Sequence, residues 1–374
     1  MPGGKSVNKK KSSVRRIGIL TGGGDAPGIN AVIRAAVKVA VRYYGLTVIG
    51  FEDGFGGLIE NRARRLGLKD VVGILPKGGT ILGTTNRDNP FYYPVFEGGK
   101  KVFRDVSDRV MDNIATHGID ALIVIGGDGS LKIARELYEK KGLPVVGVPK
   151  TIDNDLSATD QTFGFDTALT TATDALDKLH TTAESHGRVM VLEVMGRYAG
   201  WIALHAGVAG GADVILIPEI PFTFEGVCAK IMERRQEGKK FSIVVVAEGA
   251  KPIGGELVVK KVVEDSFEKL RLGGIGNLVG EKVEEMTGIE TRVIVLGHLQ
   301  RGGSPTPFDR ILASRFGAAA VNLIMEGRFG EMVCLRTPHI TSVPLAEAVG
   351  EMRRVPLGSD IIRMARQMGI SFGD

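Results

Sequence analysis

The chain has 374 residues, of which 43% are apolar and 52 are glycine, and this profile allows two packed α/β domains with many tight strand-to-helix turns. The formal net charge is +5, but six cations lie in the first 16 residues, so the remaining chain carries about −1 and gives no sign of a nucleic-acid partner. Apolar runs such as 121–125 and 243–247 have the length of buried strands, which argues against a membrane span.

Residues 1–15 contain five lysines and arginines, no acidic residue and no apolar run of the kind found in a secretory signal. Like charges with few apolar residues cannot bury themselves, so we expect a disordered basic arm, with a weak anionic contact as the alternative, on a cytoplasmic protein. Cys228 and Cys334 lie far apart in the chain and predict neither a disulfide framework nor a zinc site.

From Arg16 onward, short β-branched runs alternate with helical segments. Strands are expected at 17–20, 121–125 and 145–148, with helices at 29–43 and 131–139. A second series of strands is expected at 189–194, 214–217, 243–247 and 293–297. This alternation predicts an α/β fold with two helix-covered, largely parallel sheets.

Two glycine-rich segments follow predicted strands and open predicted helices. In TGGGDAPGIN, residues 21–30, and GGDGS, residues 126–130, backbone N–H groups can approach an anion at the positive end of a helix. Such turns also occur only to pack a strand against a helix, and that alternative stays open for each segment alone. Asp128 is a candidate Mg²⁺ ligand, with a helix cap as its structural alternative.

PKTIDND, residues 149–155, places two carboxylates, an amide, a hydroxyl and an ammonium after a third strand. Ligands of open α/β sheets bind at the carboxyl ends of strands, and such a cluster suits phosphoryl transfer, although a structural turn can look similar. Arg197 in EVMGRYAG, and His298 and Arg301 in GHLQRGG, add donors suited to a sugar phosphate. A single arginine in either segment would more often form a surface salt bridge, so the prediction of a sugar-phosphate site depends on all these segments together.

Together these segments resemble the phosphofructokinase family. TGGGDAPGIN, GGDGS, PKTIDND, EVMGRYAGW and TRVIVLGHLQRGGSPTPFDRILASR stand in the family's order, from about Arg16 to the final helix. The resemblance implies two Rossmann-like three-layer α/β domains with the active site in the cleft between them. A larger donor-binding domain would comprise residues 16–164 and 300–350, and a smaller sugar-phosphate domain residues 165–299 and 351–374.

The resemblance further implies a glycolytic 6-phosphofructokinase that transfers the γ-phosphoryl group of ATP to the 1-hydroxyl of fructose 6-phosphate with Mg²⁺. Asp153 would be the general base, Thr151 and Asp155 would position the hydroxyl and the metal, and Arg197 would stabilise the charge in transfer. Asp128 would carry Mg²⁺. The remaining implied ligands bind the sugar phosphate (Met195, Gly196, Glu248, His298, Arg301), the 6-phosphate of a neighbouring subunit (Arg188, Arg292) and the donor (Gly23, Arg87, Gly129, Ser130, Lys150).

Shared sugar sites make a homotetramer, or at least a dimer, the expected assembly. The loop that contains Arg87, residues 84–89, looks one residue longer than the family's usual arginine-containing loop, which leaves that assignment less secure.

The donor is the main question that the sequence leaves open. Gly129 leaves room for the α-phosphate of a nucleotide, where pyrophosphate-using relatives carry Asp, and so favours ATP. Lys150 points the other way, because the pyrophosphate enzymes carry Lys there, as do some ATP enzymes. ATP is therefore the expected donor, and pyrophosphate is the alternative.

Other protein classes explain fewer of the motifs. NAD and lipid kinases also use a GGDG turn, and a Rossmann oxidoreductase would need GxGxxG, which TGGGDA is not. A non-catalytic sugar-phosphate sensor would have lost the base, whereas Asp153 and Asp128 are both present.

Overall fold

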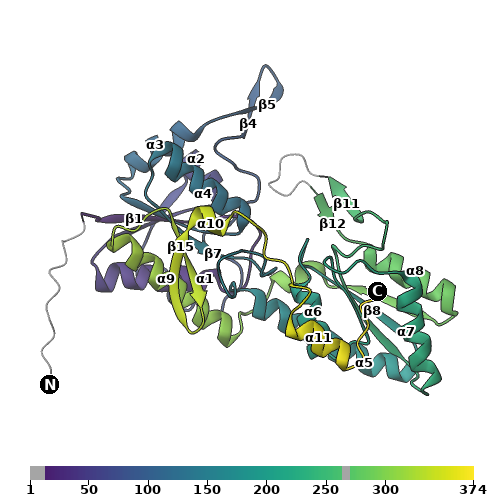
Figure 1. Cartoon of the computed structure of the whole chain (residues 1–374). Coiled ribbons are helices and arrows are strands. Elements are labelled where there is room, and N and C mark those ends of the chain that lie inside the picture. The colour runs from purple at the N-terminus through teal and green to yellow at the C-terminus, as the bar shows by residue number, and fades with distance from the viewer. Residues whose placement is uncertain (1–12, 263–269) are drawn as a thin grey trace, which may run out of the picture.

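The computed structural model describes residues 13–262 and 270–374, so most of the predicted basic arm, residues 1–15, lies outside the described residues. Two lobes lie side by side, each built on one sheet (Figure 1). Each sheet is largely parallel and covered by helices, which confirms the predicted α/β fold. No helix within the described ranges is both long and apolar enough to cross a bilayer.

The first lobe contains a seven-stranded sheet in the order β15-β14-β7-β6-β1-β2-β3, in which only the outermost pairs, β14 with β15 and β2 with β3, are antiparallel. Its central strands are apolar runs that are buried on both faces, as expected of a helix-covered parallel sheet. The strands are β1 (Arg16–Thr21), β2 (Thr47–Phe51), β3 (Ala63–Leu66), β6 (Ala121–Gly126), β7 (Val145–Pro149), β14 (Glu331–Arg336) and β15 (His339–Pro344).

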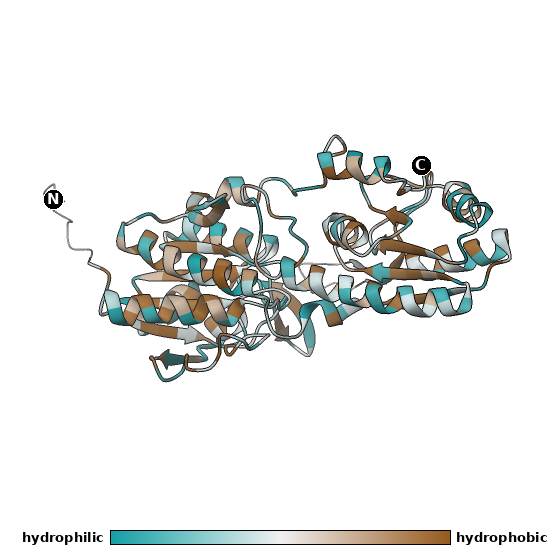
Figure 2. Ribbon diagram, turned by 90° about the horizontal axis from the view of Figure 1, so that it is seen from below, coloured by the Kyte–Doolittle hydropathy of each residue, from teal (hydrophilic) through white to brown (hydrophobic). Residues whose placement is uncertain are grey.

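Helices cover both faces of this sheet and bury an apolar layer on each (Figure 2). One face carries α1 (Ile29–Lys38), which continues as a π-helical turn over Val39–Tyr43, and α9 (Pro307–Met325). Thr306 caps α9, because its hydroxyl accepts a hydrogen bond from the N–H of Asp309. The other face carries α2 (Phe55–Glu60), α3 (Ser107–Thr116), α4 (Asp128–Lys141) and α10 (Leu345–Ala348).

The second lobe contains a four-stranded parallel sheet in the order β13-β8-β10-β9. Its strands are β8 (Val189–Val194), β9 (Val214–Leu216), β10 (Ser242–Ala247) and β13 (Thr291–Val295). One face packs on α5 (Phe165–His186), α6 (Trp201–Ala209) and α11 (Asp360–Gln367), and the other on α7 (Phe224–Gln236) and α8 (Ile275–Thr287).

Two strand boundaries in this lobe differ from the sequence prediction. The strand expected at 293–297 is β13, which ends at Val295, because Gly297 adopts a left-handed φ of 49° and opens a 3-10 turn over Gly297–Arg301. The strand expected at 214–217 ends one residue early, at Leu216.

Two antiparallel hairpins project from the lobes and were not predicted. The first pairs β4 (Tyr93–Glu97) with β5 (Lys100–Arg104), and the second pairs β11 (Val259–Val262) with β12 (Leu270–Leu272). In Figure 1 both extend on the same side of the molecule, one from each lobe.

The chain returns from the first lobe to the second near residue 353. The N–H of Arg353 donates to the carbonyl of Asp155 at 2.8 Å, and its own carbonyl accepts from the indole of Trp201 at 2.9 Å. Its guanidinium also lies 4.4 Å from the centre of the Trp201 ring. This crossing segment therefore contacts both the PKTIDND loop and α6.

Candidate active site

The carboxyl ends of β1, β6 and β7 lie next to one another in the first sheet. The N–H of Gly22 donates to the carbonyl of Ile125 at 2.9 Å, and that of Lys150 donates to Gly126 at 2.9 Å. These bonds join the three loops that the sequence marked as phosphate-binding and catalytic. The loops form one continuous surface because parallel strands end at the same edge.

Ser130 is buried beneath the first two loops. A methyl group on Gly22 would lie 2.5 Å from its Oγ, and one on Gly126 would lie 2.3 Å from its Cβ, so both glycines make room for this side chain. Its hydroxyl is buried and has no hydrogen-bond partner among the described residues. An unsatisfied buried hydroxyl at a helix N-terminus is suited to a ligand oxygen.

Lys150 places a buried ammonium beside the same surface, with 3% of the residue exposed. It donates to the carbonyl of Gly24. Gly23 has a left-handed φ of 81°, and a methyl group on it would lie 3.3 Å from the Lys150 Nζ. The backbone of this loop can therefore approach an anion that the ammonium also attracts.

Asp128 is the first residue of α4, whose N-cap is Gly127, so the capping alternative for Asp128 does not describe its position. Its carboxylate accepts from Lys132 at 2.7 Å on a half-exposed surface. Together with Gly129, Ser130 and Lys150 it lines a cavity of about 70 Å³. Within the described ranges, no cluster of three His, Cys, Asp or Glu side chains could hold a metal ion by itself.

This donor set suits a hard cation shared with a phosphate. The half-exposed Asp128 carboxylate and the unsatisfied Ser130 hydroxyl line the same cavity, and Mg²⁺ is commonly bound by one or two protein oxygens together with phosphate oxygens and water.

The PKTIDND loop holds Asp153 almost fully buried, at 3% exposure. The Thr151 hydroxyl accepts from the Asp153 N–H at 3.0 Å, and Asn154 takes a left-handed φ of 54° while its side-chain oxygen accepts from the Thr162 N–H at 3.1 Å. One carboxylate oxygen of Asp153, Oδ1, is buried and has no hydrogen-bond partner in the described part of the chain. A buried acceptor without a donor is costly unless a ligand supplies one.

Two further carboxyl groups surround Asp153. Burial and the charge of Asp153 raise the pKa of Asp155 to about 7, and the same two causes raise the pKa of Glu248 to about 7. Raised carboxyl pKa values of this kind gather at functional sites.

Arg197 reaches the same place from the second lobe. It follows β8 with a left-handed φ of 53°, and its N–H donates to Glu248 Oε1 at 3.0 Å. The turn is fixed by Gly249, on which a methyl group would lie 1.8 Å from the Arg197 carbonyl oxygen. The N–H of Met195 donates to the buried Gln300 at 2.8 Å. The backbone turn at Arg197 is thus strained and held from both sides, and the Arg197 side chain lines the small cavity.

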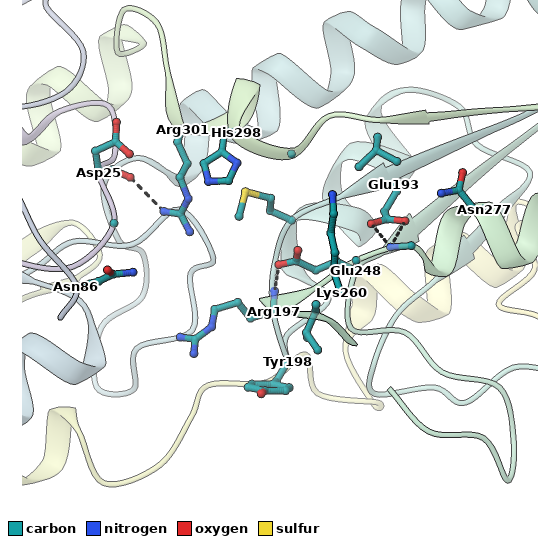
Figure 3. A pocket seen from close by; sticks show the side chains of 17 residues that line it. Asp25, Asn86, Glu193, Arg197, Tyr198, Glu248, Lys260, Asn277, His298 and Arg301 are labelled. Carbon is teal, nitrogen blue, oxygen red and sulfur yellow. Dashed lines mark hydrogen bonds between the residues drawn. The ribbon is translucent and has the colours of Figure 1, made fainter. Parts of the chain in front are cut away.

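A second cavity, of about 760 Å³, lies next to the smaller one; Figure 3 shows the side chains that line it. Both cavities are lined by Gly24, Asn86, Arg197 and Arg301, so these four residues mark the junction. Arg301 is held there by donating to the carbonyl of Asp25 at 3.1 Å. The cleft therefore joins a small, phosphate-sized cradle to a chamber large enough for a sugar phosphate.

The structure brings most of the predicted site residues together. The small cavity is lined by Gly23, Asp128, Gly129, Ser130, Lys150, Thr151, Asp153, Asp155, Arg197 and Arg301. The large cavity is lined by Met195, Arg197, Glu248, His298 and Arg301. Gly196, between Met195 and Arg197, lines neither cavity but has a φ of 143° at the base of the turn.

Three predicted residues lie elsewhere. Arg87 is exposed and lines neither cavity. Arg188 donates to Glu290 at 2.6 Å, and Arg292 binds the same carboxylate. Both arginines stand at the amino ends of β8 and β13, opposite the strand ends that face the chain's own cleft.

Several lining residues were missed by the sequence analysis, among them Gly24, Asp25, Asn86, Glu193, Tyr198, Lys260 and Asn277. Asn86 and Asp25 stand inside segments already marked, so only their individual roles were missed. Lys260 comes from the β11–β12 hairpin, which no sequence signal connected with the site. Glu193 accepts the N–H groups of Gly274 and Gly276 at 3.0 and 2.7 Å, and thereby ties β8 to the start of α8.

Comparison with known proteins shows the family of the chain. Residues 16–324 match the family model described as Phosphofructokinase. An ATP-dependent 6-phosphofructokinase of Chloroflexus aurantiacus is 57% identical over 97% of this chain and 99% of its own length. A pyrophosphate--fructose 6-phosphate 1-phosphotransferase of Streptomyces coelicolor is 51% identical over 96% of this chain and 100% of its own.

Solved structures share the fold. Phosphofructokinase from Saccharomyces cerevisiae superposes with a TM-score of 0.75 at 33% identity, covering 90% of this chain and 45% of the yeast chain. A pyrophosphate-dependent phosphofructokinase from Nitrosospira multiformis has a TM-score of 0.80 at 22% identity over 96% of this chain and 93% of its own. The latter similarity supports the fold alone.

Proposed function

The chain belongs to the phosphofructokinase family, and from this premise we propose that it is an ATP-dependent 6-phosphofructokinase, a transferase of glycolysis. The cleft would move the γ-phosphoryl group of ATP to the 1-hydroxyl of fructose 6-phosphate. The observation that carries the proposal is the buried, unpartnered Oδ1 of Asp153 beside the small cavity, which the acceptor hydroxyl can satisfy as a donor.

In the proposed reaction, Asp153 accepts the proton of the 1-hydroxyl as its oxygen bonds to the γ-phosphorus and the bond to the β-phosphate oxygen breaks. The products are fructose 1,6-bisphosphate and ADP, and the proton leaves from Asp153. Thr151 and Asp155 orient the hydroxyl, and Arg197 stabilises the negative charge on the transferred group. Met195, Gly196, Glu248, His298 and Arg301 bind the sugar phosphate.

On the donor side, Gly23, Gly129, Ser130 and Lys150 bind the phosphates, whereas Arg87, which the resemblance implied as a further donor ligand, is exposed and lines neither cavity. Asp128 would hold Mg²⁺, which supplies charge neutralisation between the donor's phosphates when bound. Pyrophosphate is the second candidate donor, because the buried ammonium of Lys150 lines the small cavity and would bind the end of a short phosphate chain as readily as the terminal phosphate of a nucleotide. Gly129 supports ATP, since it leaves the first turn of α4 open.

The domain assignment and the assembly complete the proposal. Residues 16–164 with 300–350 would bind the donor, and residues 165–299 with 351–374 the sugar phosphate. Arg188 and Arg292 would reach the 6-phosphate in a neighbouring subunit's cleft, in a cytoplasmic homotetramer or dimer. Their position away from the chain's own cleft, with a shared Glu290 partner, supports that role.

The direct test is formation of fructose 1,6-bisphosphate from fructose 6-phosphate and Mg²⁺, with ATP and with pyrophosphate in parallel. We expect ATP-dependent turnover, and a loss of about 100-fold to 10,000-fold in kcat for Asp153→Ser. Turnover with pyrophosphate alone would keep the family and change the donor. If neither donor supports turnover while both ligands bind, the chain is a sugar-phosphate sensor.

A further inference from the structure

The loop over residues 84–89 is fixed against the first glycine-rich segment at its amino end. The Thr84 hydroxyl donates to the carbonyl of Gly23 at 2.6 Å and to that of Thr21 at 3.0 Å. The Gly23 N–H donates to the carbonyl of Thr85 at 2.9 Å. These bonds set the register of the loop, so the residue presented to the cleft is the next one in the chain.

That next residue is Asn86, and it lines both cavities. Its neighbour Arg87 lines neither, is exposed, and has its N–H on the Thr85 hydroxyl at 3.3 Å. The positive charge of Arg87 instead acts on Asp88, where it opposes the rise in pKa that burial causes in that carboxyl group. The loop therefore lines the cleft with an amide, while its arginine is exposed and lines neither cavity.

The junction of the two cavities has opposing sides. In Figure 3 Asn86 points into the cleft from the donor side, opposite Arg197 and Arg301. The fourth junction residue, Gly24, has no side chain, and a methyl group there would lie 2.9 Å from the Arg301 guanidinium. A phosphoryl group that passes from the small cavity to the large one must cross between the amide and the two cations.

We propose that Asn86, rather than Arg87, is the residue of this loop that contacts the phosphoryl group during transfer, by donating a hydrogen bond from Nδ2 to a phosphoryl oxygen. The inference rests on the proposed function and adds a residue to it. A neutral amide orients the group without adding charge, because Lys150, Arg197 and Arg301 already supply cations around the junction. The extra residue of this loop places the arginine one position beyond Asn86, the residue that lines both cavities.

The test compares Asn86→Ala, Asn86→Asp and Arg87→Ala for kcat and for the KM of donor and acceptor. We expect kcat to fall about 10-fold to 100-fold in Asn86→Ala, the effect of one hydrogen bond to a charged group. Asn86→Asp, which keeps the shape and presents a carboxylate to the phosphoryl group, should fall at least about 10-fold further. Arg87→Ala should stay within about 3-fold, since a surface cation contributes little.

A purely structural role would affect Asn86→Ala and Asn86→Asp alike, or neither, and either result overturns the inference. A larger loss in Arg87→Ala than in Asn86→Ala also overturns it. Thermal melting of each variant shows whether it is folded, and Asn86→Gln, which retains the amide, should recover part of kcat. No turnover by the wild type with ATP or pyrophosphate defeats the proposed function, whereas normal wild-type turnover with unaffected Asn86 variants defeats this inference alone.

Discussion

Asp153, Asp155 and Glu248 bring three carboxyl groups close together at the cleft, and a ligand with donors and cations would offset their mutual repulsion. Without that ligand, two of the three hold their protons up to about neutral pH, as their pKa values of about 7 require. The site is therefore built for its occupied state, and the empty protein carries an electrostatic cost.

This cost makes the stability of the ligand-free protein depend on pH. The pKa of Glu248 rises from 4.5 to about 7 on folding, so between these values the folded state binds a proton that the unfolded chain has released. The free energy of unfolding should fall as pH rises through this window, and Glu248→Gln should recover on the order of 2 to 3 kcal/mol at pH 8 and little at pH 4.

Denaturant unfolding of the wild type and Glu248→Gln at both pH values measures the difference. Glu256→Gln, at an exposed position, is the matched control and should change neither value. An equal gain at both pH values would mean that packing rather than charge is responsible.

Gly129 should control the choice of donor. In Gly129→Asp a carboxylate enters the small cavity beside the donor's α-phosphate, so kcat/KM with ATP should fall about 100-fold or more, with a much smaller change for pyrophosphate. Parallel assays with both donors measure the ratio. Gly358→Asp, the control, places the same charge at a glycine with open space around it and should not change the ratio of kcat/KM for the two donors. Equal losses with both donors in Gly129→Asp would contradict the argument that Gly129 favours ATP.

Individual roles were harder to predict from the sequence than the motifs that contain them. The placement of Asp153 and Ser130 at one cavity could be predicted, because each follows a strand within a recognisable segment. The placement of Asn86 rather than Arg87 at the cavities could not, because the hydrogen bonds of Thr84 and Thr85 that set the register do not show in the sequence.

At the scale of elements, the start of α4 depends on the close approach of β1 and β6. Gly126→Ala puts a methyl group 2.3 Å from the Ser130 Cβ, and this overpacking should destabilise the fold by about 1 to 3 kcal/mol. Adding Ser130→Gly removes the clashing atom and should restore part of the loss, so the two changes should not be additive. Urea denaturation of the single and double variants measures the coupling, with Gly358→Ala as the neutral control; strict additivity would contradict the steric explanation.

The elements themselves were predictable where the chain alternates buried strands with amphipathic helices. Each predicted strand exists, because β-branched apolar runs of this length have few alternatives inside a helix-covered sheet. The β4–β5 and β11–β12 hairpins were missed, since their sequences are rich in charge and lack that pattern, and β4 and β5 are partly exposed. The presence of Lys260 in the large cavity follows from the second hairpin and was out of reach for the same reason.

At the scale of the whole molecule, Arg188 and Arg292 should act in a neighbouring subunit's cleft. Arg292→Ala should raise the KM for fructose 6-phosphate at least about 10-fold and leave that for the donor unchanged. Unfolding and refolding a 1:1 mixture of Arg292→Ala and Asp153→Ser chains should then restore activity at fructose 6-phosphate concentrations below the wild-type KM, where each variant alone is nearly inactive. A hybrid pair contains one intact site, which gives about a quarter of wild-type activity in a dimer. Each variant refolded alone is the control, and a mixture no more active than the two separately would show that the sites are not shared.

The overall architecture also bears on how the donor can change in the course of evolution. The seven-stranded sheet takes strands from residues 16–149 and again from 331–344, while the chain between them builds the four-stranded sheet and α11 returns to it afterwards. Neither lobe is thus encoded by one continuous stretch of gene, so the exchange of a single continuous segment would not replace either lobe whole. We therefore expect a change of donor to arise through substitutions within an intact fold, which fits the occurrence of relatives named for ATP and for pyrophosphate at comparable sequence distance.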